Sequence, residues 1–207
     1  MKGAVPARPS RRRDRRSWRD EEFAALDFET TGLDPKRDHI VSFGVVPITS
    51  GRIAVGDHIY RQVSPPKRPT PTSVTIHGLR QADLDASPGI DLTRDLLGAS
   101  LEHRYIVAWA AEIEAAFLAQ AFGGSVRSWR RRIIDAMVLA RSLDGLPHSQ
   151  ALSTHSLSAA AEMLGVPVHS PHDALDDALT TAQVFLVLAT RSSQNRSRDV
   201  RWLLQAG

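Results

Sequence analysis

Two carboxylates on one short apolar segment constrain the fold of this chain more than any other feature. The segment begins with the apolar run Phe23–Leu26 and continues through Asp27 and Glu29. A short apolar run bounded by turn residues indicates a buried strand, and side chains two positions apart on a strand point to the same face. The polar segment Thr30–Pro35 predicts the turn that ends the strand. The fold must therefore place two acids side by side at the end of a buried strand.

Three interpretations of this acidic pair follow from the residues alone. Asp27 and Glu29 can share a proton, as paired carboxylates do in acid–base catalysis, because like charges this close raise at least one pKa. They can bind a hard divalent cation, which readily takes carboxylate oxygens as ligands. They can also lie on an ordinary half-exposed strand face, where both are solvated. The rest of the sequence decides among these.

The composition is typical of a globular protein of about one domain. The chain has 207 residues, of which 42% are hydrophobic and 24% are charged, enough for a sizeable core. It has no cysteine, which excludes disulfides, thiolate metal sites and a cysteine nucleophile. No apolar run reaches the length of a membrane span, and because no apolar segment follows the basic residues 1–20, we expect no secretory signal there. We therefore expect a cytoplasmic protein without a membrane partner.

The charge is distributed unevenly along the chain. Residues 1–20 hold eight Lys or Arg and two Asp, and residues 191–207 hold four Arg and one Asp, so the net charge of +3 leaves −6 on residues 21–190. An acidic centre that handles a polyanion needs metal ions or local basic patches at its site. We expect residues 1–20 to be a disordered basic arm, which either contacts nucleic acid or serves as a solubilising tail.

Alternating strand and helix patterns predict an α/β fold. Strands are expected at 23–29, 40–48, 53–63, 105–109 and 131–134, helices at 87–98, 111–122, 135–143, 156–165 and from about 171, and a loop at 75–79. The short links between the first three strands favour antiparallel pairing, and the later alternation favours a mixed sheet flanked by helices. We predict one domain at 21–190 and a tail at 191–207 that can dock as a short helix.

A second acidic stretch, His172–Ala178, opens the last long helix. His172 is expected in its first turn and Asp177 in its second, so that both lie near a common point where the helix dipole favours an anionic ligand. The alternative is a capping or surface histidine and a surface carboxylate. Because Asp177 borders the apolar stripe of Ala174 and Ala178, we expect it to face the sheet.

Together these two stretches resemble the DEDDh family of 3′→5′ exonucleases, which includes the proofreading subunit of the bacterial replicative polymerase. Leu26–Pro35 is similar to the first motif of that family, and His172 with Asp177 match its third motif, His-x4-Asp. The resemblance covers roughly residues 22–190. It implies a ribonuclease H-like mixed five-stranded sheet with the first motif on its central strand. Asp135 resembles a common aspartate after the fifth strand, which we interpret as structural.

The middle motif departs from the family pattern. The family usually carries His-Asn-Ala-x-Phe-Asp after the fourth strand, and this chain has Trp109-Ala110-Ala111-Glu112-Ile113-Glu114 instead. Glu114 stands where the acidic metal-site residue is expected, one methylene longer than Asp, which puts the second metal site in question. The alternative is a plain helix-surface charge, although the Ala and Ile around it favour an inward-facing turn.

The resemblance implies phosphodiester hydrolysis by a two-metal mechanism with two Mg²⁺ or Mn²⁺ ions. In that pattern Asp27 bridges the ions, Glu29 and Asp177 complete one site, and Glu114 supports the other. His172 takes a proton from the attacking water, and an ordinary histidine pKa of about 6.5 suits a base near neutral pH.

The resemblance also implies residues that bind the substrate end. The backbone around Thr30 is expected to meet the terminal 3′-hydroxyl, Leu33 to wedge against the terminal base, and His77 to contact the end nucleotide. Such a site accepts unpaired ends, because a base must splay out of its duplex to insert.

We therefore predict a metal-dependent 3′→5′ exonuclease that acts on single-stranded or frayed 3′ ends of DNA or RNA and releases nucleoside 5′-monophosphates. One alternative is a nucleic-acid-binding module of the same fold whose catalysis is weakened by the changes at Trp109, Ala110 and Glu114. The other is an exoribonuclease or oligonucleotide-clearing enzyme, because no residue visibly senses the 2′-hydroxyl. The sequence does not identify a polymerase or any other protein partner.

Overall fold

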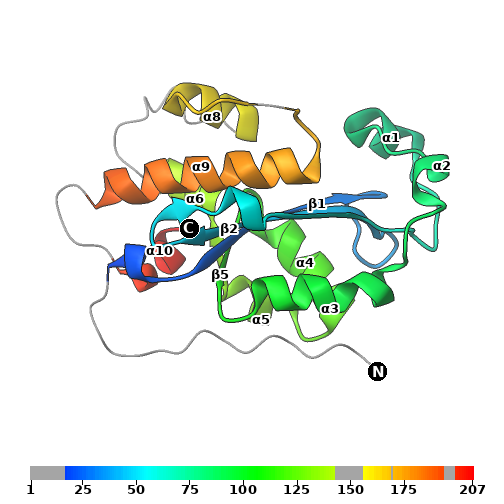
Figure 1. Ribbon diagram of the computed structural model, residues 1–207, viewed down its shortest axis with the longest axis horizontal. Coiled ribbons are helices and arrows are strands. Elements are labelled where there is room, and N and C mark those ends of the chain that lie inside the picture. The colour runs from blue at the N-terminus through cyan, green and yellow to red at the C-terminus, as the bar shows by residue number, and fades with distance from the viewer. Residues whose placement is uncertain (1–16, 143–155, 169, 194–198) are drawn as a thin grey trace.

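A six-stranded mixed sheet forms the centre of the computed structural model, which describes residues 17–142, 156–168, 170–193 and 199–207 (Figure 1). The strands are β1 (Phe23–Thr30), β2 (Ile40–Thr49), β3 (Arg52–Ile53), β4 (Ile59–Gln62), β5 (Tyr105–Ala108) and β6 (Ile133–Asp135). Their order is β3-β2-β1-β5-β6, and β4 also pairs with β2. The α/β fold with a mixed sheet flanked by helices is confirmed, and the expected third strand is divided into β3 and β4.

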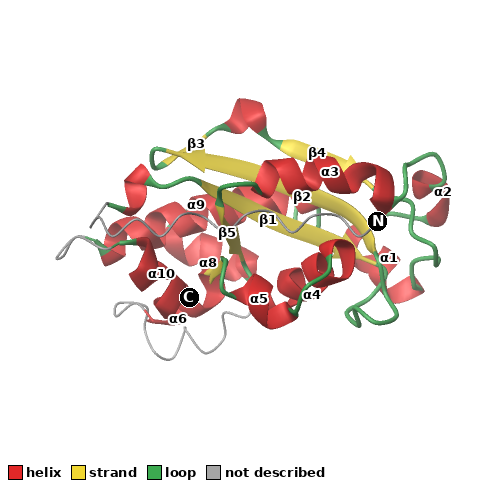
Figure 2. Cartoon of the chain, turned by 90° about the horizontal axis from the view of Figure 1, so that it is seen from below, coloured by secondary structure: helices red, strands yellow, loops and turns green. Residues whose placement is uncertain are grey.

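The helices cover both faces of the sheet, as the second view shows (Figure 2). They are η1 (Trp18–Asp20), η2 (Val55–Asp57), α1 (Pro71–His77), α2 (Gln81–Leu84), α3 (Ile90–Leu101), α4 (Ala111–Phe122), α5 (Val126–Arg130), α6 (Ala136–Ser142), α8 (Leu157–Leu164), α9 (Ala174–Ser192) and α10 (Val200–Ala206). Among the described residues, no helix combines the length and the apolar composition that crossing a bilayer requires.

β1 is the central strand, and its two faces enter two separate cores. It pairs antiparallel with β2 and parallel with β5. Phe23 and Ala25 pack with α9, α8 and α6, whereas Ala24 and Leu26 pack with α3 and α4. Side chains alternate along a strand, so the odd-numbered positions of β1 share the face that α9 covers. The alternation therefore places the acidic pair of β1 on the α9 face.

Several boundaries differ from the sequence-based expectation for local physical reasons. The third strand is interrupted by η2, because the chain makes a 3₁₀ turn over Val55–Asp57. The helix expected at 87–98 begins at Ile90 and continues through Gly98 to Leu101, because packing outweighs the weak helix propensity of glycine. Residues 75–79, expected as a loop, contain the end of α1, which Thr70 caps and Gly78 closes in a left-handed conformation. The short helices α2 and α5 were not expected.

The two ends of the chain contribute packed elements where they are described. Residues 1–16 of the expected arm lie outside the described residues, but Trp18 is only 1% exposed and its ring meets Phe23 and Phe185 edge-on. Residues 17–20, expected as part of the arm, therefore belong to the packed structure, because the aromatic side chain lies in the core. Near the other end, α10 packs against α6 and β6, with Leu203 fully buried.

A glycine on β2 sets how closely α9 approaches the sheet. Gly44 is paired with Asp27 across the β1–β2 ladder. A Cβ atom at Gly44 would lie 2.1 Å from the carbonyl oxygen of Ala174 and 2.6 Å from the Cα of Leu175, both in the first turn of α9. Backbone cannot yield as a flexible side chain can, so only glycine lets the helix rest directly on the strand. This contact sets the distance between the start of α9 and the acidic end of β1.

We expect Gly44→Ala to destabilise the fold by about 1–3 kcal/mol or more, as overpacking does when the neighbour is backbone. Urea denaturation measures the change in the free energy of unfolding. Gly56→Ala is the matched control, because a Cβ atom at Gly56 meets nothing within 4 Å. Equal stability of the two variants would contradict the close contact between β2 and α9.

Candidate active site

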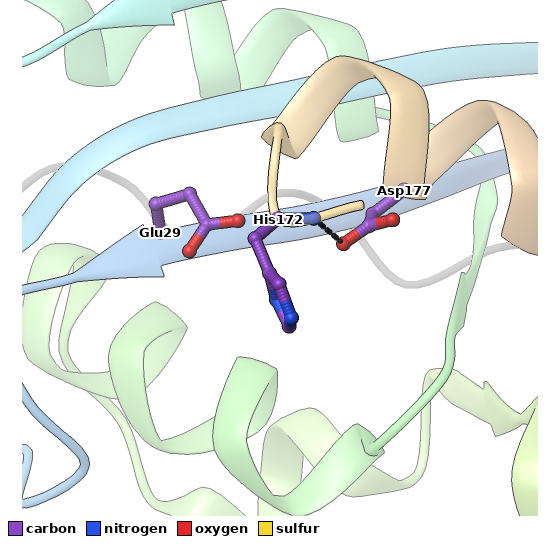
Figure 3. Close-up of side chains that lie close together, drawn as sticks. All are labelled: Glu29, His172 and Asp177. Carbon is purple, nitrogen blue, oxygen red and sulfur yellow. Dashed lines mark hydrogen bonds between the residues drawn. The ribbon is translucent and has the colours of Figure 1, made fainter. Parts of the chain in front are cut away.

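The structure brings Glu29, His172 and Asp177 together (Figure 3). One possible ligand atom from each of the three lies within 4.8 Å of the others. Glu29 comes from β1, His172 from the turn before α9, and Asp177 from α9 itself. The strand and the helix thus meet at the point where the two sequence motifs were expected to converge.

Three aspartates at the start of α9 have three different tasks. Asp173 is the N-cap, and its Oδ1 accepts hydrogen bonds from the backbone N–H groups of Leu175 and Asp176 at 2.9 and 3.2 Å. Asp176 holds the preceding turn, because its Oδ2 accepts a bond from the N–H of Ser170 at 3.2 Å. Only Asp177 is directed to the site, where it joins Glu29.

His172 precedes α9 and is not part of its first turn, which corrects the sequence-based expectation. Asp173 is the N-cap, so the helix begins at Ala174, about three residues later than expected, and His172 has a left-handed backbone with φ of 65°. The backbone N–H of His172 donates to Oδ2 of Asp177 at 3.0 Å, which orients that carboxylate. The imidazole is exposed to solvent and lies below the carboxylates of Glu29 and Asp177 in Figure 3, where a ligand can reach it.

Glu114, in the first turn of α4, is buried at 4% exposure and is not a surface charge. Its Oε2 is fully enclosed and has no hydrogen-bond partner among the described residues. The charge of Glu114 is the strongest charge effect on Asp27, so α4 does bring this acid to the end of β1. The structure therefore places Glu114 inside the protein, within electrostatic reach of Asp27.

The carboxylates of the site resist ionisation together. Burial, followed by the charges of Glu114, Glu29 and Asp177, raises the pKa of Asp27 well above its ordinary value. Burial and the charge of Asp177 raise the pKa of Glu29 to about 8, and burial raises that of Glu114 to about 8. Burial also raises the pKa of Asp177, although the N–H of His172 opposes it. At neutral pH the site therefore favours a bound proton or a bound cation.

The donor set of the site fits hard divalent cations. It offers carboxylate oxygens and one imidazole, and the chain has no cysteine to supply a thiolate. The enclosed Oε2 of Glu114 is a carboxyl oxygen without a hydrogen bond, and a cation would satisfy it. Glu29 and Asp177 lie close enough to share one ion, and Asp27 lies in the field of both and of Glu114.

The three residues expected to bind the substrate end lie around this centre. Thr30 is buried at the end of β1, where its hydroxyl donates to the carbonyl of Gly32 at 2.7 Å. Leu33 is 74% exposed on the loop that follows. Nδ1 of His77 accepts from the N–H of Leu79 at 3.1 Å, and its buried Nε2 is near the Thr30 backbone without a well-formed hydrogen bond. Burial, supported by the charge of His172, lowers the pKa of His77.

Trp109 and Ala110 of the middle motif, and Asp135, support the fold around the start of α4. Trp109 is 8% exposed and packs into the core under α9. Ala110 is the N-cap of α4 and offers no side-chain oxygen. Asp135 compensates, because its Oδ2 accepts from the N–H of Ala111 at 3.2 Å and its Oδ1 from the N–H of Val138 at 3.0 Å. One buried carboxylate thus holds the start of both α4 and α6.

Sequence reasoning missed Asp38, which holds the loop that carries Leu33. Asp38 is buried, accepts a hydrogen bond from the Thr31 hydroxyl at 3.1 Å, and accepts another from the N–H of Asp34 at 3.0 Å. A Cβ atom at Gly32 would lie 2.5 Å from its Oδ2. Burial alone would raise the pKa of Asp38, but these hydrogen bonds and the charge of Lys67 lower it. No local pattern signals this role, because the loop closes only in three dimensions.

Comparison with known proteins agrees with this geometry. A family model described as exonuclease matches residues 24–185. The PolC-type DNA polymerase III of Thermotoga maritima is 36% identical over 174 residues, which are 84% of this chain and 12% of that protein. The chain thus spans about an eighth of the length of this relative. The resemblance to exonucleases inferred from the sequence is confirmed.

Two solved structures share the fold. E. coli Exonuclease I in complex with a dT13 oligonucleotide superposes with a TM-score of 0.71 at 16% identity, over 84% of this chain and 42% of that one. The nuclease domain of 3′hExo, a DEDDh family member bound to rAMP, superposes with a TM-score of 0.68 at 17% identity, over 86% of this chain and 96% of that one. The ribonuclease H-like arrangement expected from the sequence is confirmed by these likenesses.

We expect the stability of the metal-free protein to fall as the pH rises from about 4.5 to about 8. Glu29 and Glu114 have a pKa of about 8 in the folded protein against an ordinary 4.5, so the folded state holds more protons in this window. The free energy of unfolding then decreases with each proton lost on raising the pH. Urea denaturation in EDTA across this range measures the slope.

Glu29→Gln should flatten this slope, and the exposed Asp57→Asn should leave it unchanged. Added Mg²⁺ or Mn²⁺ should restore stability to the wild type at pH 8, because an ion that binds only the folded state stabilises it. If Glu29→Gln showed the same pH dependence of the free energy of unfolding as the wild type, the pKa of Glu29 would not be raised in the folded protein.

Proposed function

The chain belongs to the exonuclease family whose model matches residues 24–185, and on that basis we propose that it is a divalent-metal-dependent 3′→5′ exonuclease. Its substrates are single-stranded or frayed 3′ ends of nucleic acid, from which it releases nucleoside 5′-monophosphates. The observation that carries the proposal is the convergence of Glu29, His172 and Asp177 within 4.8 Å, with Asp27 and Glu114 in the same electrostatic field.

Four carboxylates are assigned to the ions. Glu29 and Asp177 would hold one ion and Glu114 the other, and Asp27 would contribute to both sites. When bound, two divalent ions supply charge stabilisation for the attacking and leaving oxygens of an in-line displacement. The arrangement of the chain supports this assignment, because each acid comes from an element whose position is fixed by packing. β1 carries two of them, and α4 and α9 carry one each.

His172 is assigned as the general base. Its exposed imidazole lies within 4.8 Å of the Glu29 and Asp177 oxygens, so it can accept a proton from a water that attacks the phosphorus. The hydrogen bond from its backbone N–H to Asp177 ties the turn that carries the base to that carboxylate. Solvent exposure then gives the proton a path to bulk water after each turnover.

We assign the binding of the 3′-terminal nucleotide to the region of Thr30, Leu33 and His77. An exposed leucine on an anchored loop provides an apolar face for an unpaired base, and His77, at the end of α1, lies near the Thr30 backbone. A base that stacks there must leave its duplex, which favours single-stranded or frayed ends. Digestion of end-labelled DNA and RNA oligomers with Mg²⁺ or Mn²⁺ tests the direction, the substrate and the alternative of an oligonucleotide-clearing enzyme.

We expect Asp27→Asn and Asp177→Asn each to lower the hydrolysis rate by at least ~100-fold, as the loss of a group that stabilises transition-state charge does. Release of 5′-monophosphates from a 3′-labelled single strand measures the rate. Asp176→Asn is the matched control on the same helix, because asparagine can still accept the hydrogen bond from Ser170. Wild-type turnover in Asp27→Asn would refute the site, and near-zero turnover in the wild type would favour the binding-module alternative.

We also expect Glu114→Gln to lower the rate about 100-fold and Glu114→Asp to retain measurable activity, because the shorter acid keeps the charge. Mg²⁺ demands a near-ideal octahedral shell, so Glu114→Asp should alter the ratio of the rates with Mg²⁺ and Mn²⁺. The matched control is Glu112→Gln, on the same turn but exposed and paired with Arg130 at 2.9 Å. Equal rates in Glu114→Gln and Glu112→Gln would mean that Glu114 holds no ion.

A further inference from the structure

Two loops beside the active site carry four exposed cations. Lys36 and Arg37 lie on the loop after β1, and Lys67 and Arg68 lie on the proline-rich crossing between β4 and α1. We name these four residues the basic rim. Building on the proposed function, we propose that the basic rim binds the phosphates of the nucleic-acid strand on the 5′ side of its terminal nucleotide.

The two loops of the basic rim are fastened to each other. Lys67 Nζ lies 3.5 Å from Oδ1 of the buried Asp38, which belongs to the first loop. The hydroxyl of Thr70, on the second loop, donates to the carbonyl of Thr31 at 3.3 Å. The side-chain amide of Gln120, on α4, donates to the carbonyls of Pro35 and Asp38 in the first loop, at 2.7 and 2.8 Å. The four cations therefore stand on a fixed platform, which lowers the entropic cost of binding a strand.

The first loop of the basic rim adjoins the active site. The first loop follows β1 directly, so Thr30 and Lys36 are separated by six positions, and Leu33 lies between them. A strand whose terminal base rests on Leu33 has its next phosphates close to the residues that follow in the same loop. In Figure 1 this end of β1 lies on the side of α1 and α2, opposite α10.

The positive charge of the basic rim offsets the repulsion between the acidic site and a nucleic-acid strand. Residues 21–190 carry a net charge of −6, and the centre of the site is itself a cluster of acids, so an approaching polyanion is repelled. Within 31–39 and 64–70 the carboxylates are Asp34 and Asp38, and Asp38 is buried against Lys67. The basic rim is therefore a local positive field beside an acidic centre, as phosphate binding requires.

The test compares two triple variants of the full chain that remove the same charge. Lys36→Gln/Arg37→Gln/Arg68→Gln neutralises the basic rim and leaves Lys67 in its contact with Asp38. The control, Arg52→Gln/Arg191→Gln/Arg201→Gln, neutralises exposed cations at the opposite end of the molecule. Arg191 is 14 residues beyond Asp177 on α9, or about 21 Å along the helix. Binding of fluorescein-labelled dT20 is followed by anisotropy in EDTA over a range of salt concentrations, so that no turnover is needed.

We expect the rim variant to bind dT20 at least ~10-fold more weakly at low salt, with a salt dependence of log K that is shallower by about 2, since each lost phosphate contact on a single strand contributes about 0.7. The control should stay within about twofold of the wild type, as no assigned contact is lost. Equal weakening in both variants, or an unchanged salt slope in the rim variant, would overturn the proposal.

A second measurement separates this proposal from the proposed function. The p-nitrophenyl ester of thymidine 5′-monophosphate has no phosphate on the 5′ side of the scissile group, so its hydrolysis with Mn²⁺ should be the same in the rim variant and the wild type. A loss of ester hydrolysis in the rim variant alone would overturn the proposal, because the rim would then support the catalytic centre. If the wild type hydrolyses neither ester nor oligomer, the proposed function fails, and the comparison of dT20 binding still decides on the basic rim.

Discussion

Repulsion among buried carboxylates is the interaction on which the rest of the structure depends. The pKa of Asp27 is raised first by burial and then by the charges of four other acids, and the pKa values of Glu29 and Glu114 are raised to about 8. A flexible chain would separate such groups to solvate each charge, because burying an unpaired charge is costly. The fold holds them together instead, and this preorganises the site for cations that bring the charges into balance.

The scaffold resists this repulsion with contacts between backbone elements. α9 rests on β2 at Gly44 without an intervening side chain, which fixes Asp177 relative to β1. Asp135 ties the start of α4 to the start of α6 and so fixes the turn that carries Glu114. Because each acid is anchored through its own element, the repulsion acts on the stability of the whole fold rather than on the shape of the site.

The sequence predicted the features that depend on local pattern. The central strand, α4 and α8 with its Ser156 cap follow directly from apolar periodicity and turn residues. Asp177 could be placed on the inner face because its neighbours on the helix are small and apolar, and the structure brings it to Glu29. A carboxylate beside an apolar stripe is informative in itself, since burying a charge needs a partner.

The features that the sequence could not supply arise from contacts between distant segments. Gly44 is an ordinary strand residue until Ala174 approaches it, and Asp38 is an ordinary loop acid until Thr31 and Lys67 close around it. The interruption of the third strand by η2 likewise depends on how the chain turns between two short ladders on β2. Propensity describes one segment at a time and does not contain these contacts.

At His172, the backbone conformation that the fold requires and the side chain that the proposed chemistry requires favour different residues. A residue with a Cβ atom at φ of 65° costs roughly 1–2 kcal/mol relative to a relaxed backbone, a penalty that glycine does not have. The turn therefore favours glycine, and the proposed chemistry requires an imidazole. A His172→Gly protein would keep all four acids, relax the turn before α9 and lack only the base, which makes it suited to crystallisation with an uncleaved strand bound.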